Sequence, residues 1–294
     1  SEMSDTNLPI VEFRNVDIVF DKNPAPILKM LDQGVTRQEI QDRCGVVVGV
    51  IDASIKVAEG EICVLMGLSG SGKSTLLRAV NGLSKVSRGG VLIRDGGQAV
   101  DICRCDPNTL RRLRTHRVAM VFQQFALLPW RTVRENVGFA LELRGMPREA
   151  RERIVDEKLQ LVGLKKWADK YAHELSGGMQ QRVGLARAFA TDADVLLMDE
   201  PFSALDPLIR EHLQDELLML QHKLKKTIIF VSHDLDEALK LGTHIAIMES
   251  GRIVQYGKPE EIVLKPANDY VKEFVAHMNP LNVLKSSRKA IFSA

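Results

Sequence analysis

Residues 62–75 read ICVLMGLSGSGKST, an apolar run followed by a glycine-rich loop that ends in Lys73, Ser74 and Thr75. The loop fits the pattern G-x-x-x-x-G-K-[S/T] and lies between a predicted strand and a predicted helix, STLLRAVNGL, the context that a phosphate-binding loop requires. Glycines let backbone N–H groups close around a phosphate, and the N-terminus of the following helix adds partial positive charge. The stretch therefore predicts a nucleotide-phosphate site on an α/β fold.

Within this loop the side chains have separate expected roles. Lys73 is expected to reach the outer phosphates and to serve catalysis, and Ser74 is expected to ligate Mg²⁺. The candidate ATP-binding residues of the loop are Gly67, Leu68, Ser69, Gly70, Ser71, Gly72, Lys73, Ser74 and Thr75.

Four further runs, VAMVF, DVLLMDE, TIIFVSH and HIAIMES, alternate with helical stretches and predict a mostly parallel sheet covered on both faces. Open parallel sheets bind ligands at the carboxyl ends of their strands. Asp199 there suits the Mg²⁺ shell, and Glu200 can orient and deprotonate water. Gln123 and His233 end two more predicted strands, and both can reach the γ-phosphate. Gln123 is also a candidate metal ligand. A histidine without such a setting is more often structural.

The remaining patterns suggest one domain built from several parts. Residues 8–124 and 191–284 are expected to form the α/β core, with an antiparallel edge sheet from the alternating runs near the N-terminus. Residues 125–190 carry almost no strand signal and predict an inserted helical subdomain. Residues 285–294 have no periodicity and are expected to form a tail.

Residues 24–45 interrupt the first strands and predict two short helices. Thr36 with Glu39 three residues later fits a capping box, and Gly45 fits a helix stop. A surface insertion with only a packing role is the other interpretation of this segment.

Composition places the chain among ordinary globular proteins. It is 45% hydrophobic and 27% charged, and its net charge of +2 gives no reason to expect nucleic acid as a partner. No apolar run approaches the roughly 20 residues that cross a bilayer, so a cytoplasmic location is expected. The four cysteines lack zinc-site spacing, and Cys63 in its apolar run is expected to be a small core residue.

Taken together, the order of motifs resembles the ATPase subunits of ABC transporters. The glycine loop, the glutamine after VAMVF, LSGGMQQR at 175–182, VLLMDE, SALD and the histidine of VSHD carry the resemblance over roughly residues 10 to 280. It implies a P-loop NTPase fold with a RecA-like parallel sheet core, an antiparallel β edge subdomain and an inserted α-helical subdomain. It also implies ATP hydrolysis with Mg²⁺. Met179 departs from the commonest version of the signature, which has glutamine there.

The same resemblance suggests why a second glycine loop is present. Such ATPases pair head to tail as homodimers, so Ser176, Gly177 and Gly178 of one subunit would cover the γ-phosphate held by the other. These residues begin a helix whose dipole favours an anion. Asp206 in SALD is implied to lie at the interface. Phe20 is the best candidate for stacking on adenine, although a plain strand residue is an equally good interpretation.

The insertion is similar to one found in importer subunits for quaternary amines, the glycine betaine, proline betaine and choline group, and Trp130 in LLPWRTV favours choline. A separate membrane permease and an extracytoplasmic substrate-binding protein are implied partners, with the chain peripheral on the cytoplasmic side of the inner membrane. The strip Gln124–Arg131 suits a groove for a permease helix, or else is a buried loop.

Many betaine-type members continue into regulatory CBS domains, which these residues lack, so either the natural chain is longer or sensing of ionic strength is absent.

A soluble ABC ATPase acting on DNA, ribosomes or cluster assembly is the alternative function, but the double cassette, coiled coil or basic patches typical of that class are missing. Glu200 argues against a switch without turnover.

Overall fold

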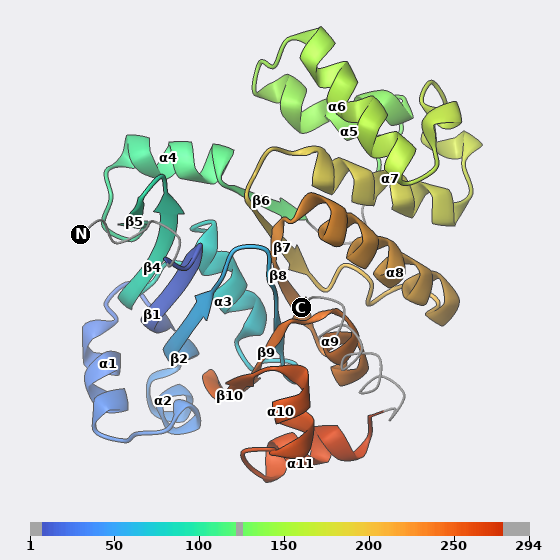
Figure 1. Cartoon of the computed structure of the whole chain (residues 1–294). Helices are drawn as coiled ribbons and strands as arrows, with labels where there is room; N and C mark the ends of the chain where they lie inside the picture. The colour runs from blue at the N-terminus through green and yellow to red at the C-terminus, as the bar shows by residue number, and fades with distance from the viewer. Residues whose placement is uncertain (1–7, 122–125, 279–294) are drawn as a thin grey trace, which may run out of the picture. The chain divides into compact units, whose positions relative to one another are not determined.

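The computed structural model describes residues 8–121 and 126–278, which fall into two compact units (Figure 1). The first unit combines the chain up to Arg114 with the chain from Thr227 onward, and the second runs from Thr115 to Lys226. Gln123 and the expected tail lie outside the described residues. The domain division drawn from the sequence remains a prediction.

An antiparallel sheet of the first unit has the strand order β2-β1-β4-β5. β1 pairs with β2 from Val11 opposite Val57 to Phe20 opposite Val47, which confirms the antiparallel edge expected from the alternating N-terminal runs. The β4–β5 hairpin was not predicted. The strands are β1 (Val11–Phe20), β2 (Val47–Val57), β4 (Arg88–Asp95) and β5 (Gln98–Asp101).

A second group of strands in the first unit has the order β10-β9-β3-β8, with β3 parallel to both β8 and β9. Every residue of β3 and β8 is buried, which explains their continuous apolar sequences. Cys63 is fully buried in β3, as expected, and burial raises the pKa of its thiol to about 12. The strands are β3 (Ile62–Met66), β8 (Thr227–Ser232), β9 (His244–Glu249) and β10 (Arg252–Gly257).

Helices of the first unit include the one that follows the phosphate loop, as predicted. The structure also confirms two short helices in the insertion, where the Thr36 hydroxyl accepts a hydrogen bond from the Glu39 N–H and Gly45 ends α2 with a φ of 65°. The helices are α1 (Ala25–Asp32), α2 (Arg37–Cys44), α3 (Lys73–Val80), α9 (Leu235–Leu241), α10 (Pro259–Leu264) and α11 (Asp269–Ala276), together with α4 (Pro107–His116), which ends in the second unit.

The second unit contains the parallel pair β6 (Val118–Val121) and β7 (Val195–Asp199) and a set of helices. α5, α6 and α7 pack on one another, which confirms the helical character expected after residue 125. The helices are α5 (Val133–Leu143), α6 (Arg148–Leu161), α7 (Gly177–Ala190) and α8 (Pro207–Leu224), with 3-10 turns η3 (Lys165–Trp167) and η4 (Ala172–Glu174). Across residues 8–121 and 126–278, every helix is too short or too polar to span a bilayer.

Candidate nucleotide site

The phosphate loop joins β3 to α3 in the first unit, and Lys73 lies at its centre. The Lys73 side chain is buried, and its Nζ donates hydrogen bonds to the carbonyl oxygens of Gly67 at 2.7 Å and Leu68 at 3.2 Å. The Ser71 N–H also donates to the Leu68 oxygen, at 3.1 Å. The loop therefore wraps closely around an ammonium group, which is the charge that an outer phosphate needs.

Glycine is required at two positions of this loop by the atoms that surround them. A Cβ at Gly67 would lie 2.5 Å from both the Met248 carbonyl oxygen and the Ser71 hydroxyl. Gly72 has a φ of 99°, and a Cβ there would lie 2.4 Å from the Gly49 carbonyl oxygen. Non-glycine residues avoid such φ values, and contacts this short are not tolerated, so the loop conformation excludes side chains at both sites.

The polar groups of the loop fit a phosphate ligand. Ser71 Oγ is buried and has no hydrogen-bond partner among the described residues. Because buried hydroxyls are nearly always hydrogen-bonded to protein, water or ligand, this atom can serve as a donor to a bound phosphate. Ser74 and Thr75, both half-buried, follow Lys73 in the first turn of α3. An ammonium, an unpaired hydroxyl and a helix N-terminus together form a donor set for an anion.

Phe20 lies beside this loop, at the end of β1. Its side chain is 53% exposed, and a Cβ added at Gly49 would lie 2.8 Å from the Phe20 ring and 3.0 Å from the Thr75 methyl group. The ring and Thr75 thus adjoin the same glycine. An exposed aromatic ring next to the phosphate loop has the placement that stacking on adenine needs. Its role in stacking remains a prediction.

His233 follows β8 and is exposed. It lines a cavity of about 440 Å³ together with Leu68 of the phosphate loop and Tyr270 of α11. The turn that carries it is fixed by Ser232, whose Oγ donates to Glu237 at 2.7 Å and accepts from the Asp234 N–H at 3.1 Å. Within the first unit, the structure therefore brings His233 and the phosphate loop to one cavity.

Asp199 and Glu200 lie at the end of β7 in the second unit. Asp199 is buried, whereas Glu200 is half-buried and has a φ of 48°. This left-handed conformation costs a residue other than glycine about 1–2 kcal/mol. Strained residues of this kind concentrate at functional sites, so the geometry of Glu200 supports the catalytic role expected from its sequence position.

The second glycine loop begins α7. Ser176 is the N-cap of this helix, and its Oγ accepts a hydrogen bond from the Met179 N–H at 3.3 Å. A Cβ added at Gly177 or Gly178 would meet no described atom within 4 Å beyond its chain neighbours and its own helix backbone. Ser176 and Gly177 at the start of α7 are exposed, as is Asp206, the N-cap of α8.

Leu127 and Leu128 of the expected docking strip are half-buried, and Trp130 is 71% exposed. A residue that sequence reasoning missed holds this segment. Asn136 of α5 is fully buried, its Oδ1 accepts from the Leu128 N–H at 2.7 Å, and its Nδ2 donates to the oxygens of Leu128 and Arg131. A buried polar residue within the apolar helix VRENVGFALEL was the available signal. Gln124 lies outside the described residues.

Two further contacts to the phosphate loop also escaped sequence reasoning. Arg37 Nη1 of α2 donates to the Gly70 carbonyl at 2.8 Å, and the Tyr270 hydroxyl of α11 accepts from the Leu68 N–H at 3.3 Å. The partners are separated by 33 and 202 residues along the chain. No local pattern marks contacts over such separations.

A phosphate loop between a parallel strand and a helix, an antiparallel sheet and a helical segment that begins with a second glycine loop define the class of ATP-binding cassettes. The chain belongs to the ABC transporter family, whose pattern it matches over residues 50–203. This confirms the predicted fold class.

The similar proteins include two transport ATP-binding proteins. The chain is 51% identical over 264 residues to the glycine betaine/proline betaine transport system ATP-binding protein ProV of Escherichia coli (strain K12), covering 90% of this chain and 65% of ProV. It is 48% identical over 283 residues to the glycine betaine transport ATP-binding protein OpuAA of Bacillus subtilis (strain 168), covering 96% and 67%. The chain thus spans about two thirds of the length of these relatives.

Among solved structures, the chain resembles the dimeric post-hydrolysis state of the ATP-binding cassette MJ0796 bound to ADP and Pi. The TM-score is 0.64 at 29% identity, and the match covers 85% of this chain and 98% of that one. The similarity extends over most of the described fold.

Proposed function

We propose that this chain is the ATP-hydrolysing subunit of an ABC importer that takes up a quaternary amine such as glycine betaine or choline. The observation that carries the nucleotide part is the enclosed phosphate loop, with Lys73 at its centre and the hydroxyl of Ser71, which has no hydrogen-bond partner in the described part of the chain. The transport part is supported by the 51% identity to ProV, a glycine betaine/proline betaine transport protein. Both relatives described above carry transport names, which favours transport over action on DNA, ribosomes or cluster assembly.

In this proposal different side chains bind the phosphates, hold the metal ion and activate water. Lys73 and the loop N–H groups bind the phosphates, while Ser74, Asp199 and Gln123 would hold Mg²⁺, which would neutralise phosphate charge. Glu200 orients and deprotonates the attacking water, and His233 stabilises the γ-phosphate region. A hydroxyl, a carboxylate and an amide oxygen would suit Mg²⁺, because this ion prefers oxygen ligands and usually takes few of them from the protein.

The second glycine loop acts, in this proposal, on the nucleotide of a second copy of the chain. Ser176, Gly177, Gly178 and Asp206 would meet the partner's ATP in a head-to-tail homodimer. The openness of Gly177 and Gly178 supports this, because nothing described in the chain itself occupies the space that they leave. The dimeric state of MJ0796 with ADP and Pi is a precedent among similar structures.

For the membrane partner, we propose that a permease helix docks on the second unit near Trp130. Leu143 and Tyr171 of the same unit are also exposed, at 72% and 40%. The main chain of Thr132 pairs with that of Tyr171, and Arg131 forms an ion pair with Glu142, so these segments adjoin. The chain would then lie at the cytoplasmic side of the inner membrane, and a substrate-binding protein would deliver the amine from the opposite side.

A docking test measures ATPase activity of the isolated chain and of the chain reconstituted with its permease. Trp130→Ala should leave the activity of the isolated chain unchanged and abolish stimulation by the permease. Leu264→Ala, which removes a 76% exposed leucine from α10 of the first unit, is the matched control and should keep the stimulation. Equal stimulation of both variants would rule out docking at Trp130.

The central experiment asks whether the second loop serves the partner. In a Glu200→Gln background, Ser176→Arg should leave ATP binding by the monomer intact and abolish the ATP-dependent dimer. Lys73→Ala should also form no dimer. A mixture places both lesions at one shared site and leaves the other site intact, so mixed dimers should hold about one ATP per pair. Light scattering measures the fraction of dimer, and labelled ATP measures the nucleotide bound per dimer. Loss of ATP binding by the Ser176→Arg monomer would show that the second glycine loop acts within its own chain.

A further inference from the structure

The insertion between β1 and β2 has a small apolar core that fixes it to the antiparallel sheet. Ile27 and Leu31 of α1 and Ile40 of α2 are buried against residues of β1 and β2. Figure 1 shows both helices beside these two strands. The cluster comprises Val19, Ile27, Leu31, Ile40, Val48 and Ile51. Because its helices pack on strands, the insertion is a fixed part of the first unit.

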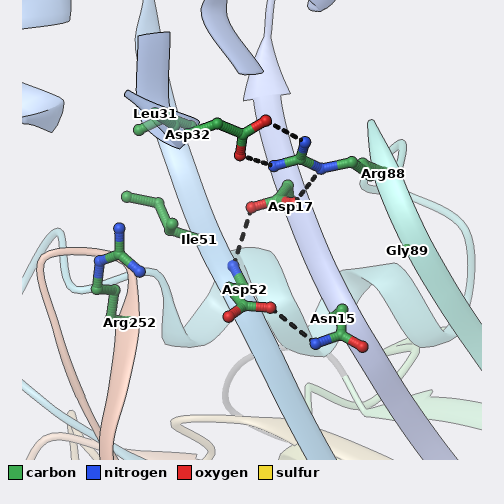
Figure 2. A pocket seen from close by; sticks show the side chains of 9 residues that line it. All are labelled: Asn15, Asp17, Leu31, Asp32, Ile51, Asp52, Arg88, Gly89 and Arg252. Carbon is green, nitrogen blue, oxygen red and sulfur yellow. Dashed lines mark hydrogen bonds and ion pairs between the residues drawn. The ribbon is translucent and has the colours of Figure 1, made fainter. Parts of the chain in front are cut away.

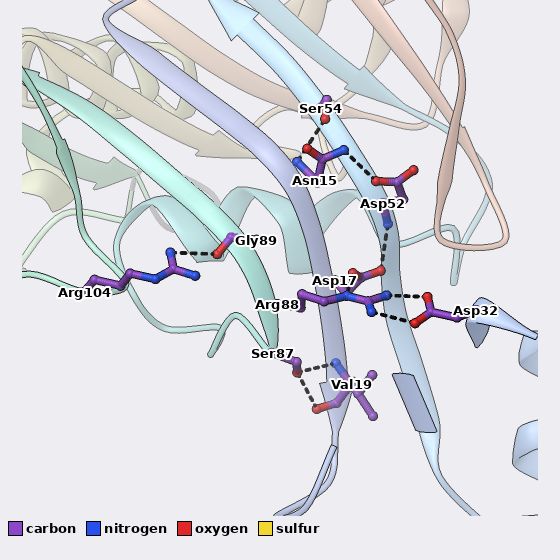
Figure 3. Close-up of polar contacts among 10 residues, drawn as sticks. All are labelled: Asn15, Asp17, Val19, Asp32, Asp52, Ser54, Ser87, Arg88, Gly89 and Arg104. Carbon is purple, nitrogen blue, oxygen red and sulfur yellow. Dashed lines mark hydrogen bonds and ion pairs between the residues drawn. The ribbon is translucent and has the colours of Figure 1, made fainter. Parts of the chain in front are cut away.

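A polar network adds a second attachment, at the end of α1. Both Nη atoms of Arg88 on β4 donate to the Asp32 carboxylate at 2.8 Å, and its Nε donates to the buried Asp17 of β1 at 2.8 Å (Figure 3). The Arg88 hydrogen bonds lower the pKa of Asp32. Asp17 also accepts from the Asp52 N–H at 2.9 Å, along the wall of a cavity of about 350 Å³ (Figure 2). Arg88 therefore joins α1 to two strands.

Arg37 is the first residue of α2, and the start of this helix is held by its cap. Thr36 caps the helix, which fixes the main chain at Arg37. From this position the half-buried Arg37 reaches the phosphate loop, where its Nη1 donates to the Gly70 oxygen at 2.8 Å. The phosphate loop thus accepts a hydrogen bond from a guanidinium of the insertion, in addition to its contacts with β3 and α3. A packing insertion alone needs no such contact.

Other parts of the first unit hold the loop as well. The Tyr270 hydroxyl of α11 accepts from the Leu68 N–H and donates to the Met248 oxygen at 3.1 Å. The Gly251 N–H donates to the Ser71 oxygen at 2.9 Å. The carbonyl groups of two consecutive loop residues, 70 and 71, are therefore bonded to donors outside the loop. Because a carbonyl oxygen repels phosphate, a loop that admits phosphate must keep such groups turned away.

We infer that Arg37 of the insertion and Tyr270 of α11 are positioning residues, which hold the phosphate loop open for ATP by fixing the Gly70 carbonyl and the Leu68 N–H. They act on the affinity for nucleotide and leave the chemical step to other groups. The inference rests on the proposed function in that the ligand is ATP. It gives residues 24–45 a role beyond packing.

Arg37 is tested by ATP titration of the chain and by steady-state kinetics. Arg37→Met keeps much of the apolar stem and removes the donor, so it should weaken ATP binding by about 10- to 100-fold, the loss expected for one hydrogen bond from a charged donor. The KM for ATP should rise, while kcat at saturating ATP stays within about two-fold. Arg37→Lys, which restores a charged donor, should bind ATP more tightly than Arg37→Met.

Arg43→Met is the matched control, since Arg43 lies on the same helix and is exposed beside Glu39. It should bind ATP like the parent. Equal affinities of Arg37→Met and Arg43→Met would overturn the role of Arg37, as would a lysine variant no tighter than methionine. A parent chain that does not bind ATP would instead overturn the proposed function, so the two failures are distinct.

Tyr270 is tested in the same way by Tyr270→Phe, which removes only the hydroxyl. The KM for ATP should rise by about 3- to 10-fold with kcat little changed. Tyr256→Phe is the control, because the Tyr256 hydroxyl donates to the Lys56 oxygen of β2 at 3.1 Å. A fall in kcat without a change in KM, or an effect no larger than that of Tyr256→Phe, would contradict the role of Tyr270.

Discussion

The two glycine loops look alike in sequence and differ in their surroundings. In the phosphate loop, Gly67 and Gly72 face atoms only 2.5 and 2.4 Å from where a Cβ would lie. In the second loop, Gly177 and Gly178 face open space. The first pair is therefore required by the packing of the chain itself, whereas the second pair leaves room that no atom of residues 8–121 and 126–278 fills.

This difference separates two reasons for placing glycine in a loop. One reason is internal, because a left-handed φ or a crowded contact excludes a side chain. The other is external, because a ligand or partner needs close approach to the backbone. Substitutions in the first loop should damage the isolated chain, and those in the second should be detected only when a second copy is present.

The largest expected effect comes from Gly72→Ala. The φ of 99° and the contact with the Gly49 oxygen should lower the free energy of unfolding by about 2–4 kcal/mol and abolish ATP binding. Chemical denaturation and ATP titration measure both. Gly70→Ala is the graded control, since Gly70 has a φ of 78° but no described atom within 4 Å of an added Cβ. Its loss of stability should be smaller, at about 1–2 kcal/mol, and equal losses would contradict the crowding argument.

The next largest effects are expected from two substitutions that remove a charge and add no bulk. Lys73→Ala should lose ATP binding, because it removes the ammonium at the centre of the enclosed loop. Glu200→Gln should bind ATP as the parent does and lose turnover, because the amide cannot accept the proton of water. Nucleotide titration and phosphate release assays separate the two. Equal loss of affinity in both variants would remove the distinction between binding and catalytic roles.

Gly178→Ala should have a small effect on the isolated chain. At the second position of α7 an added methyl group meets open space, so the free energy of unfolding should change by less than about 1 kcal/mol, and ATP binding by the monomer should persist. The ATP-dependent dimer in a Glu200→Gln background should weaken. Dimer assembly equal to that of the parent would show that no partner approaches this glycine.

The smallest expected effect is a difference in chemical labelling between Cys44 and Cys63. Cys44 at the end of α2 is exposed, whereas Cys63 in β3 is buried with its thiol pKa raised to about 12. Because the thiolate is the reactive form, an alkylating reagent at pH 8 should label Cys44 and leave Cys63 unmodified in the native chain. Mass spectrometry of peptides checks this. Labelling of Cys63 at the rate of Cys44 would mean that the strand before the phosphate loop opens readily.

Local patterns predicted the parts of the fold that local physics controls. The glycine pattern, the apolar strands and the Thr36 cap each depend on a few neighbouring residues, and the structure has the expected elements at these places. The β4–β5 hairpin was missed because the glycines of RGGVLIRDGGQAV interrupt its alternation. For Arg37 and Asn136, function depends on which main-chain group lies opposite, which tertiary packing decides.

The contact between Tyr270 and Leu68 has a consequence for how the chain acquires its activity during synthesis. The two residues are 202 positions apart, so at about 5–20 residues per second the ribosome needs roughly 10–40 s to supply the second after the first. Until α11 has emerged, the Leu68 N–H lacks this acceptor, and the Gly251 donor to Ser71 arrives only shortly earlier. A nascent chain therefore completes the contacts of its phosphate loop only after α11 has been synthesised, so that full ATP binding waits for residues about 200 positions downstream of the loop.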